Sequence, residues 1–254
     1  MDDKIRILFL AANPADITRL RLDEEAREID KKIRSADYRD NFELIPQLAV
    51  RPSDLQEALM RRKPHIVHFS GHGNRTEGIL LQDDQGNATP LRKEVLGNLF
   101  KILRDNIRVV VLNACYSKLQ SRSITETIDY TVVMKKPVYD ESAIAFAGAF
   151  YRALAFGRTV KEAFDLGVNE IMLLGAPGPK TPELVIRGGV NVQGDAISPA
   201  QSGGSSESGA SSERVDSSGG RTTSATGSGN VAIGGNAEGS TIVTGGVNSP
   251  SDRN

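Results

Sequence analysis

Residues 109–115 read VVVLNAC, and a second apolar run, HIVHF at 65–69, continues into SGHG at 70–73. Both runs are short, rich in branched residues and without polar–apolar alternation, which is typical of strands buried on both faces of a parallel sheet. Open α/β folds place their chemistry at the carboxyl edge of such a sheet. If the two strands are neighbours, about 4.8 Å apart, Cys115 and His72 face each other at that edge.

Strand-like and helix-like segments alternate over the first 187 residues. Strands are predicted at 4–12, 42–50, 65–70, 108–114, 130–134 and 183–186, helices at 20–35, 53–62, 91–104, 118–128, 140–156 and 159–174, and a hairpin joining 78–81 to 88–91. This alternation predicts an α/β fold with a mostly parallel central sheet of about six strands and helices on both faces. Pro46 indicates a bulged or edge strand at 42–50. Ser53 and Gln56 have the spacing of a capping box at the start of the second helix.

Composition divides the chain of 254 residues into three parts. Residues 1–187 predict one domain that is large enough for a hydrophobic core. Residues 188–229 are rich in Gly and Ser and predict a disordered linker, because few large apolar side chains are present to offset the entropy of ordering. The Gly/Asn-rich tail, 230–254, is predicted either to be disordered or to be a recruitment tag that adds strands to a partner protein.

The charge balance and the single cysteine restrict the functional class. The net charge is −1 and no run of like charges stands out, so we expect neither nucleic acid nor a membrane surface as a partner. No stretch approaches the ~20 apolar residues of a membrane span. One cysteine cannot form an intrachain disulfide and fits a reducing compartment, so we expect a cytoplasmic protein.

Cys115 is the first candidate catalytic residue. A lone buried cysteine is most often an inert small apolar residue, and this interpretation stays open on the strand alone. However, Cys115 ends its run and is followed by Tyr116, Ser117 and a predicted helix. A thiol near a helix N-terminus has a lowered pKa and a larger thiolate fraction, which favours a nucleophile.

His72 lies between two glycines, where it has no neighbouring side chains to pack on. The N–H of Gly73, together with that of Cys115, is suited to an oxyanion hole, whereas the alternative is a plain tight turn with a solvated histidine. His68 lies within its strand and is predicted to be a buried structural residue. We expect no metal at His68 and His72, because their geometry is wrong and no acidic cluster accompanies them. We also expect no cofactor, since Thr76 occupies the third position of a glycine-rich nucleotide loop and no Walker-type lysine follows.

The segments HFSGHG at 68–73 and LNACYS at 112–117, with a hairpin between them, resemble the CHAT family of caspase-like cysteine peptidases, relatives of separase, gingipain and the caspases. The likeness extends to ILFLAANP at 7–14, DESAIAF at 140–146 and FYRAL at 150–154. The resemblance implies a caspase-like fold, with His72 and Cys115 as the catalytic dyad.

The resemblance also implies a role for Asp140 at the floor of the substrate pocket, where a carboxylate selects Arg or Lys before the scissile bond. The alternative is that Asp140 caps the helix that it opens. Lys135 and Lys136 depart from the family pattern and are expected either to pair with Asp140 or to belong to a loop that blocks the pocket.

Our first hypothesis is therefore a cysteine endopeptidase that cleaves protein substrates after Arg or Lys. The resemblance implies a bacterial defence or cell-death pathway and latency until a partner, recruited through the C-terminal tail, activates the enzyme. The alternatives are a catalytically silent signalling or scaffold module and a nucleotide-using α/β module. The missing phosphate-binding loop disfavours the nucleotide-using module.

Overall fold

The structure is a computed structural model that describes residues 4–191 and residue 197. Its central sheet has six strands in the order β2-β1-β3-β7-β8-β9. All neighbours in this sheet pair in parallel except β8 and β9, which are antiparallel. The strands are β1 (Ile5–Ala12), β2 (Phe42–Leu48), β3 (Ile66–Gly71), β7 (Val109–Asn113), β8 (Tyr130–Met134) and β9 (Pro182–Ile186).

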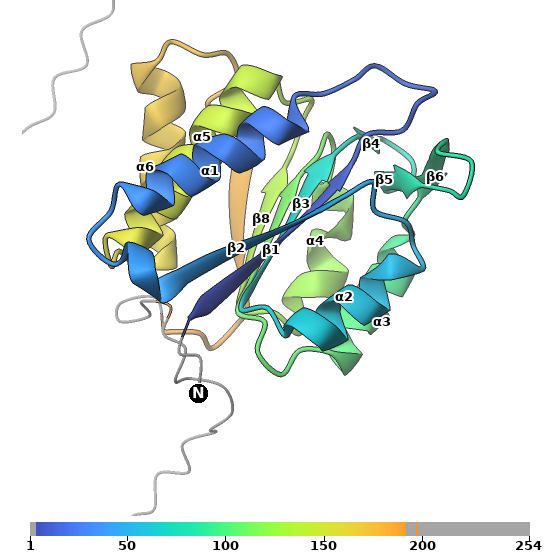
Figure 1. Cartoon of the computed structure of the whole chain (residues 1–254), viewed down its shortest axis with the longest axis horizontal. Coiled ribbons are helices and arrows are strands. Elements are labelled where there is room, and N and C mark those ends of the chain that lie inside the picture. The colour runs from blue at the N-terminus through green and yellow to red at the C-terminus, as the bar shows by residue number, and fades with distance from the viewer. Residues whose placement is uncertain (1–3, 192–196, 198–254) are drawn as a thin grey trace, which may run out of the picture. The chain divides into compact units, whose positions relative to one another are not determined.

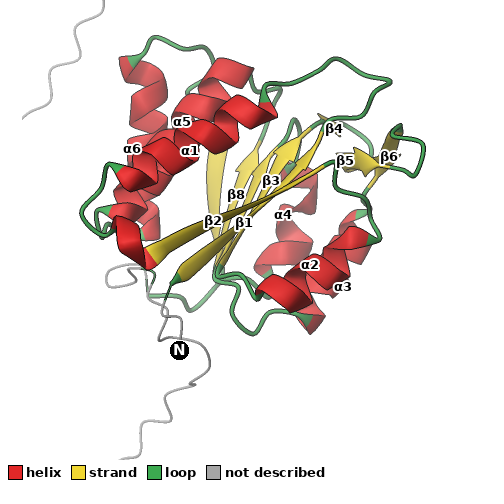
Figure 2. Ribbon diagram, in the orientation of Figure 1, coloured by secondary structure: helices red, strands yellow, loops and turns green. Residues whose placement is uncertain are grey.

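Three helices cover each face of the sheet (Figures 1 and 2). One face carries α1 (Leu22–Arg34), α5 (Asp140–Ala155) and α6 (Val160–Leu173), and the other carries α2 (Asp54–Arg62), α3 (Lys93–Ile102) and α4 (Lys118–Thr125). A short 3₁₀ turn (Arg39–Asn41) precedes β2. The predicted α/β architecture with helices on both faces is confirmed.

A second, three-stranded antiparallel sheet projects from the carboxyl edge of the central sheet. It comprises β4 (Gly73–Asn74), β5 (Gly78–Gln82) and β6 (Ala88–Pro90). The predicted hairpin comprises β5 and β6, whereas β4 was not predicted. The turn at the hairpin tip is built by Asp83, whose Oδ1 accepts the N–H groups of Gln85 (2.9 Å) and Asn87 (2.8 Å).

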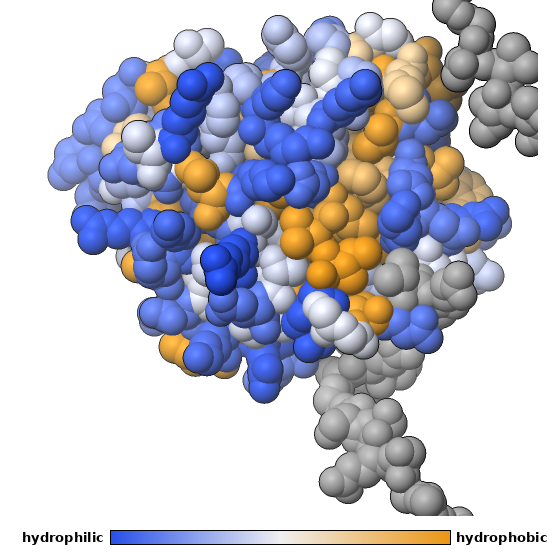
Figure 3. All heavy atoms as spheres, turned by 180° about the vertical axis from the view of Figure 1, so that it is seen from behind, coloured by the Kyte–Doolittle hydropathy of each residue, from blue (hydrophilic) through white to orange (hydrophobic). Residues whose placement is uncertain are grey.

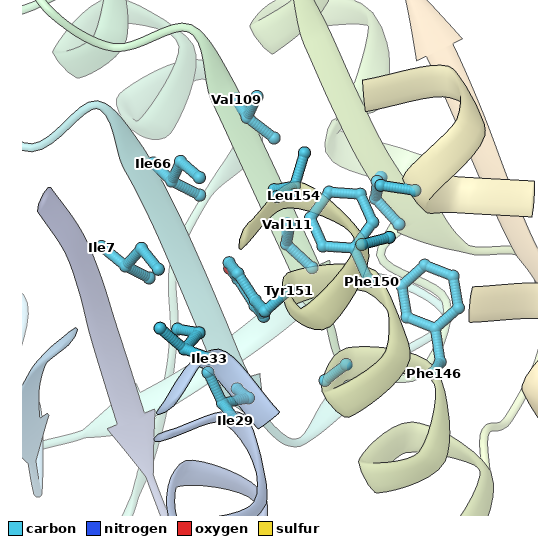
Figure 4. Packing of buried hydrophobic residues seen from close by; sticks show 14 of the residues in the cluster. Ile7, Ile29, Ile33, Ile66, Val109, Val111, Phe146, Phe150, Tyr151 and Leu154 are labelled. Carbon is cyan, nitrogen blue, oxygen red and sulfur yellow. The ribbon is translucent and has the colours of Figure 1, made fainter. Parts of the chain in front are cut away.

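Apolar side chains from both faces of the sheet fill two separate core clusters. In the cluster beneath α1 and α5, Ile7, Ile66, Val109 and Val111 of the sheet lie near Ile29 and Ile33 of α1 and near Phe146, Phe150, Tyr151 and Leu154 of α5 (Figure 4). Burial of these residues is the main force holding the helices on the sheet. Most residues of α5 are buried.

Two predictions about helix and strand ends have different outcomes. Pro46 lies in β2, which is an edge strand, as predicted. The capping box at Ser53 is wrong: Ser53 has helical backbone angles and no capping hydrogen bond from its side chain. A capping box instead opens α6, where the Thr159 side chain accepts the N–H of Glu162 and Glu162 accepts the N–H of Thr159.

The predicted linker at 188–229 lies outside the described residues except for 188–191 and 197, and the tail at 230–254 lies entirely outside them. Both remain predictions. Within the described part of the chain, every helix is too short or too polar to cross a bilayer. Seen from behind, the surface of the protein carries an apolar area among hydrophilic side chains (Figure 3).

Candidate active site

The strands that precede His72 and Cys115 are direct neighbours. β3 and β7 pair in parallel, and their register sets Ser70 opposite Asn113 at the carboxyl end. His72 follows β3 immediately, and Cys115 comes two residues after the end of β7. The predicted meeting of the two residues at one sheet edge follows from this register.

Cys115 lies in a tight turn between β7 and α4, and it is a half-buried free thiol. The next residue, Tyr116, has a φ of 57°, a left-handed conformation that costs energy for a residue with a side chain. Ser117 holds the turn, because its buried hydroxyl donates to the Leu112 carbonyl (2.8 Å) and accepts the N–H of Met134 (2.9 Å). The strain at Tyr116 is thus offset by the two hydrogen bonds of Ser117, which tie the turn to β7 and β8.

The loop after His72 touches the backbone of this turn. A Cβ atom placed on Gly73 would lie 2.1 Å from the carbonyl oxygen of Cys115, so the contact requires glycine. Gly73 pairs with Ile79 across the β4–β5 ladder, and the Leu80 N–H donates to the His72 carbonyl (2.9 Å). Because hydrogen-bonded and non-hydrogen-bonded pairs alternate in an antiparallel ladder, the amide of Gly73 points away from β5.

The imidazole of His72 contacts the segment that follows β1. Its Nε2 lies 2.7 Å from the carbonyl oxygen of Thr18. A carbonyl oxygen only accepts hydrogen bonds, so Nε2 carries the proton in this contact and Nδ1 is the basic nitrogen of the neutral ring.

Asp140 is the first residue of α5 and does not cap it, because the capping position belongs to Tyr139. The capping interpretation of Asp140 is therefore wrong. Its Oδ2 instead accepts the backbone N–H of Arg21 (3.2 Å) and lies 3.6 Å from Nε of the Arg21 guanidinium group. Neither predicted lysine is its partner: Lys135 lies 3.9 Å from Glu183, and Lys136 is exposed.

One pocket gathers the three sequence-predicted side chains. His72, Cys115 and Asp140 line it together with Arg21 and Glu25, and the remaining lining residues are Leu20, Leu22, Ser70, Gly71, Asn113, Val138, Ala143 and Ile144. Its free volume is about 40 Å³, which is room for a water molecule or two. The segment that carries Thr18 and Arg21 lies against the pocket residues.

A buried polar cluster lies next to this pocket, and sequence reasoning found only one of its members. His68 is fully buried, as predicted, and its Nδ1 lies 3.0 Å from the Tyr151 hydroxyl. Its Nε2 is 3.0 Å from Oε1 of Glu25 without forming a hydrogen bond. Burial and the Glu25 carboxylate raise the pKa of the Tyr151 hydroxyl well above its usual value.

Glu25 and Arg21 were missed by the sequence analysis. Glu25 had a visible signal, because it follows Leu22 by three residues and precedes Ile29 by four, which places a carboxylate on the apolar stripe of α1. Arg21 had none, since its contact with Asp140 spans 119 positions of sequence. Within the described residues, no group of three or more His, Cys, Asp or Glu side chains is arranged to hold a metal ion.

A mostly parallel sheet that brings a cysteine and a histidine to one carboxyl edge is the arrangement expected of the caspase-like class of protein. A family model described as the CHAT domain matches residues 7–166, and the chain belongs to that family. The expected caspase-like fold is confirmed. A caspase-1 structure from Spodoptera frugiperda superposes with a TM-score of 0.50 at 10% identity, covering 72% of this chain and 86% of the caspase. The Arg-specific cysteine proteinase gingipain R gives a TM-score of 0.50 at 12% identity, covering 73% of this chain and 47% of the proteinase.

Two curated proteins are similar in sequence. A Roc-COR-CHAT protease from an unknown prokaryotic organism is 29% identical over 160 residues, which is 60% of this chain and 15% of that protein. A protein named "Probable protease" from Gillisia limnaea is 24% identical over 155 residues, which is 59% of this chain and 27% of that protein. The matched region is thus a minor part of each of these longer relatives.

Proposed function

We propose that this protein is a cysteine endopeptidase with Cys115 as the nucleophile and His72 as its acid–base partner. The observation that carries the proposal is the pocket at the carboxyl edge of the sheet, which both residues line. The thiolate of Cys115 attacks the peptide carbonyl, and the carbonyl oxygen gains negative charge. His72 delivers a proton to the leaving amine, and water then releases the acyl group from sulfur.

The amides of Gly73 and Cys115 are proposed to hold that oxyanion. The orientation of the Gly73 N–H away from β5 supports this role, because it leaves the group outside the hydrogen bonds of the β4–β5 ladder. Among the turn and loop hydrogen bonds of the described residues, none runs from the Cys115 N–H to a backbone carbonyl oxygen, which agrees with a donor kept for the substrate. Two such donors stabilise a developing oxyanion more than they stabilise the ground-state carbonyl.

Asp140 is proposed to select Arg or Lys before the scissile bond. The contact with Arg21 supports this specificity, because the carboxylate already pairs with a guanidinium group of the same chain. A substrate arginine would replace Arg21 and make the same charge-assisted contact. The Arg-specific name of gingipain R, a structural neighbour, agrees with this choice.

The same contacts support latency. Thr18 engages His72, Arg21 engages Asp140, and the free volume of the pocket is only about 40 Å³ while they do so. Activation therefore requires the segment 13–21 to move. The longer Roc-COR-CHAT relative, in which the matched region is 15% of the protein, suggests other domains or a partner as the source of that movement. We place the enzyme in a cytoplasmic bacterial defence or cell-death pathway with a protein substrate, as the CHAT resemblance implies.

A peptide library that carries every residue before the scissile bond tests the activity. After activation, wild type is expected to cleave after Arg and Lys. Cys115→Ala and His72→Ala are expected to be inactive under the same conditions, and Asp140→Ala is expected to lose the preference for basic residues. Cleavage by Cys115→Ala at the wild-type rate would refute the proposed nucleophile. Failure of a peptide electrophile ending in Arg to label Cys115 under any activating condition would instead support a catalytically silent scaffold module.

Arg21→Gln tests the block of the pocket. The rate at which Cys115 reacts with the arginyl electrophile is expected to rise in this variant, because the substrate group no longer competes with Arg21. Arg19→Gln is the matched control, since Arg19 is an exposed arginine of the same segment and its labelling rate should equal that of wild type. Equal rates for Arg21→Gln and wild type would refute the block.

A further inference from the structure

Glu25 is a buried carboxylate that touches the ends of both strands of the proposed active site. It is 2% exposed. The Ser70 hydroxyl donates to its Oε2, and the Asn113 amide donates to its Oε1 at 2.6 Å. Ser70 and Asn113 are themselves opposite each other in the β3–β7 register. One carboxylate therefore bridges two neighbouring strands at the last paired position.

Each of these two partners lies two residues before a proposed catalytic residue. Ser70 precedes His72, and Asn113 precedes Cys115. Two residues of chain span at most about 7 Å, so a displacement of either partner reaches the catalytic side chain through very little chain. The contact between Gly73 and the Cys115 carbonyl leaves no slack between the two loops to absorb such a displacement.

Burial of the Glu25 carboxylate costs desolvation free energy, which argues against an incidental contact. It lies on the stripe of α1 formed by Leu22, Ile29 and Ile33, where an apolar side chain would bury surface without a desolvation cost. Its three polar neighbours, Ser70, Asn113 and His68, come from the sheet rather than from α1. Local rules of sequence pattern are broken most often at functional sites.

We propose that Glu25 is a positioning residue whose carboxylate ties the ends of β3 and β7 and so sets the spacing of His72 and Cys115. This inference rests on the proposed dyad. His68 and Tyr151 support the carboxylate from the core side, because His68 stacks on Phe9 with ring centroids 5.0 Å apart and bonds to the Tyr151 hydroxyl. Glu25 itself takes no part in bond making.

The rate of Cys115 alkylation by iodoacetamide tests the inference without requiring peptidase activity. An unactivated thiol with a pKa of about 8.5 is about 3% thiolate at pH 7, so loss of activation by His72 slows alkylation by up to about 30-fold. His72→Ala is expected to show this loss. Glu25→Gln, which keeps the size of the side chain, is expected to slow alkylation at least about 5-fold by misplacing His72 relative to the thiol.

The double variant separates positioning from general destabilisation. Because both substitutions remove the same activation, Glu25→Gln should slow alkylation no further in a His72→Ala background. Glu28→Gln is the matched control, because Glu28 is a half-buried carboxylate of the same helix and pairs with Lys31 and Lys32. The alkylation rate of this variant should equal that of wild type. If Glu25→Gln does not fold, Ser70→Ala removes one arm of the bridge and carries the same expectation.

Each outcome has one meaning. If His72→Ala slows alkylation but Glu25→Gln (or Ser70→Ala, where Glu25→Gln does not fold) leaves the rate unchanged, the positioning role is refuted and the dyad stands. If the two effects multiply, Glu25 acts independently of His72, and the inference is also refuted. If His72→Ala leaves the rate unchanged in protein activated as for peptide cleavage, the proposed dyad fails, and the role of Glu25 fails with it.

Discussion

Gly73→Ala places a methyl group where the structure has no space for it. The added Cβ would lie 2.1 Å from the Cys115 carbonyl oxygen and 3.2 Å from that of Gly78. An ordinary contact distance of 3.4 Å requires the His72 loop and the Cys115 turn to separate by about 1.3 Å. Both atoms in contact belong to backbone, so no side-chain rotation relieves the clash.

The separation should affect catalysis more than stability. Overpacking typically costs about 1–3 kcal/mol, which a domain of this size tolerates. A misplacement of about 1 Å at reacting groups can cost about 100-fold in rate. We therefore expect Gly73→Ala to fold, to melt a few degrees below wild type, and to cleave arginyl peptides at least about 100-fold more slowly.

Gly188→Ala is the control, because nothing lies within 4 Å of a Cβ at that position. Melting curves and peptide turnover, measured on both variants and on wild type activated in the same way, give the comparison. Turnover by Gly73→Ala within a few-fold of wild type would refute the reasoning that the backbone contact between the two loops sets the catalytic geometry.

Three further predictions concern stability. Ser117→Ala leaves the Leu112 carbonyl and the Met134 N–H without their buried partner, so it should lower the free energy of unfolding in urea by about 2–4 kcal/mol. The control Ser35→Ala removes an exposed hydroxyl and should lower it by less than about 0.5 kcal/mol. A loss for Ser117→Ala as small as that of the control would contradict the role of Ser117 in holding the turn. Thr159→Ala should cost about 1 kcal/mol by removing the capping box, and Ser53→Ala should cost almost nothing, so equal effects would count against the observed caps. Burial, and then the charge of Arg6, lower the pKa of His65 from its usual 6.5, so the unfolded chain takes up a proton at higher pH than the folded chain. Stability should therefore fall as pH drops through about 6.5, and His65→Asn should lose that part of the slope; equal slopes would contradict the shift.

The sequence predicted the sheet and the site residues that lie on it because buried parallel strands have a distinctive pattern. The runs at 65–69 and 109–115 mark neighbouring strands, and the residues that follow such strands meet at one edge by geometry alone. The predictions of helix caps were less accurate. Ser53 has the spacing of a capping box but takes a helical conformation, whereas Thr159 forms a capping box that was not predicted. Several residue types suit a helix start, and packing decides which one is used.

The contacts of the segment before and within α1 could not be predicted from local pattern. Thr18, Arg21 and Glu25 reach partners 54, 119 and 88 positions away in the chain. Such pairings depend on how α1 packs against α5 and the sheet, which periodicity does not specify. The sequence therefore indicated the proposed catalytic residues and missed the groups that surround them.

The three residues that make these contacts lie in two kinds of structure, an irregular segment and a helix. Thr18 and Arg21 lie on the irregular segment between β1 and α1, and Arg21 is the capping residue of α1 without a capping hydrogen bond from its side chain. Glu25 lies one turn inside the helix, which is anchored in the core by Ile29 and Ile33 (Figure 4). The proposed opening of the pocket therefore needs a change in backbone angles only before Leu22, and α1 can stay in the core. An activating partner that pulls on residues 13–21 would release His72 and Asp140 while Glu25 continues to hold the two strand ends in register.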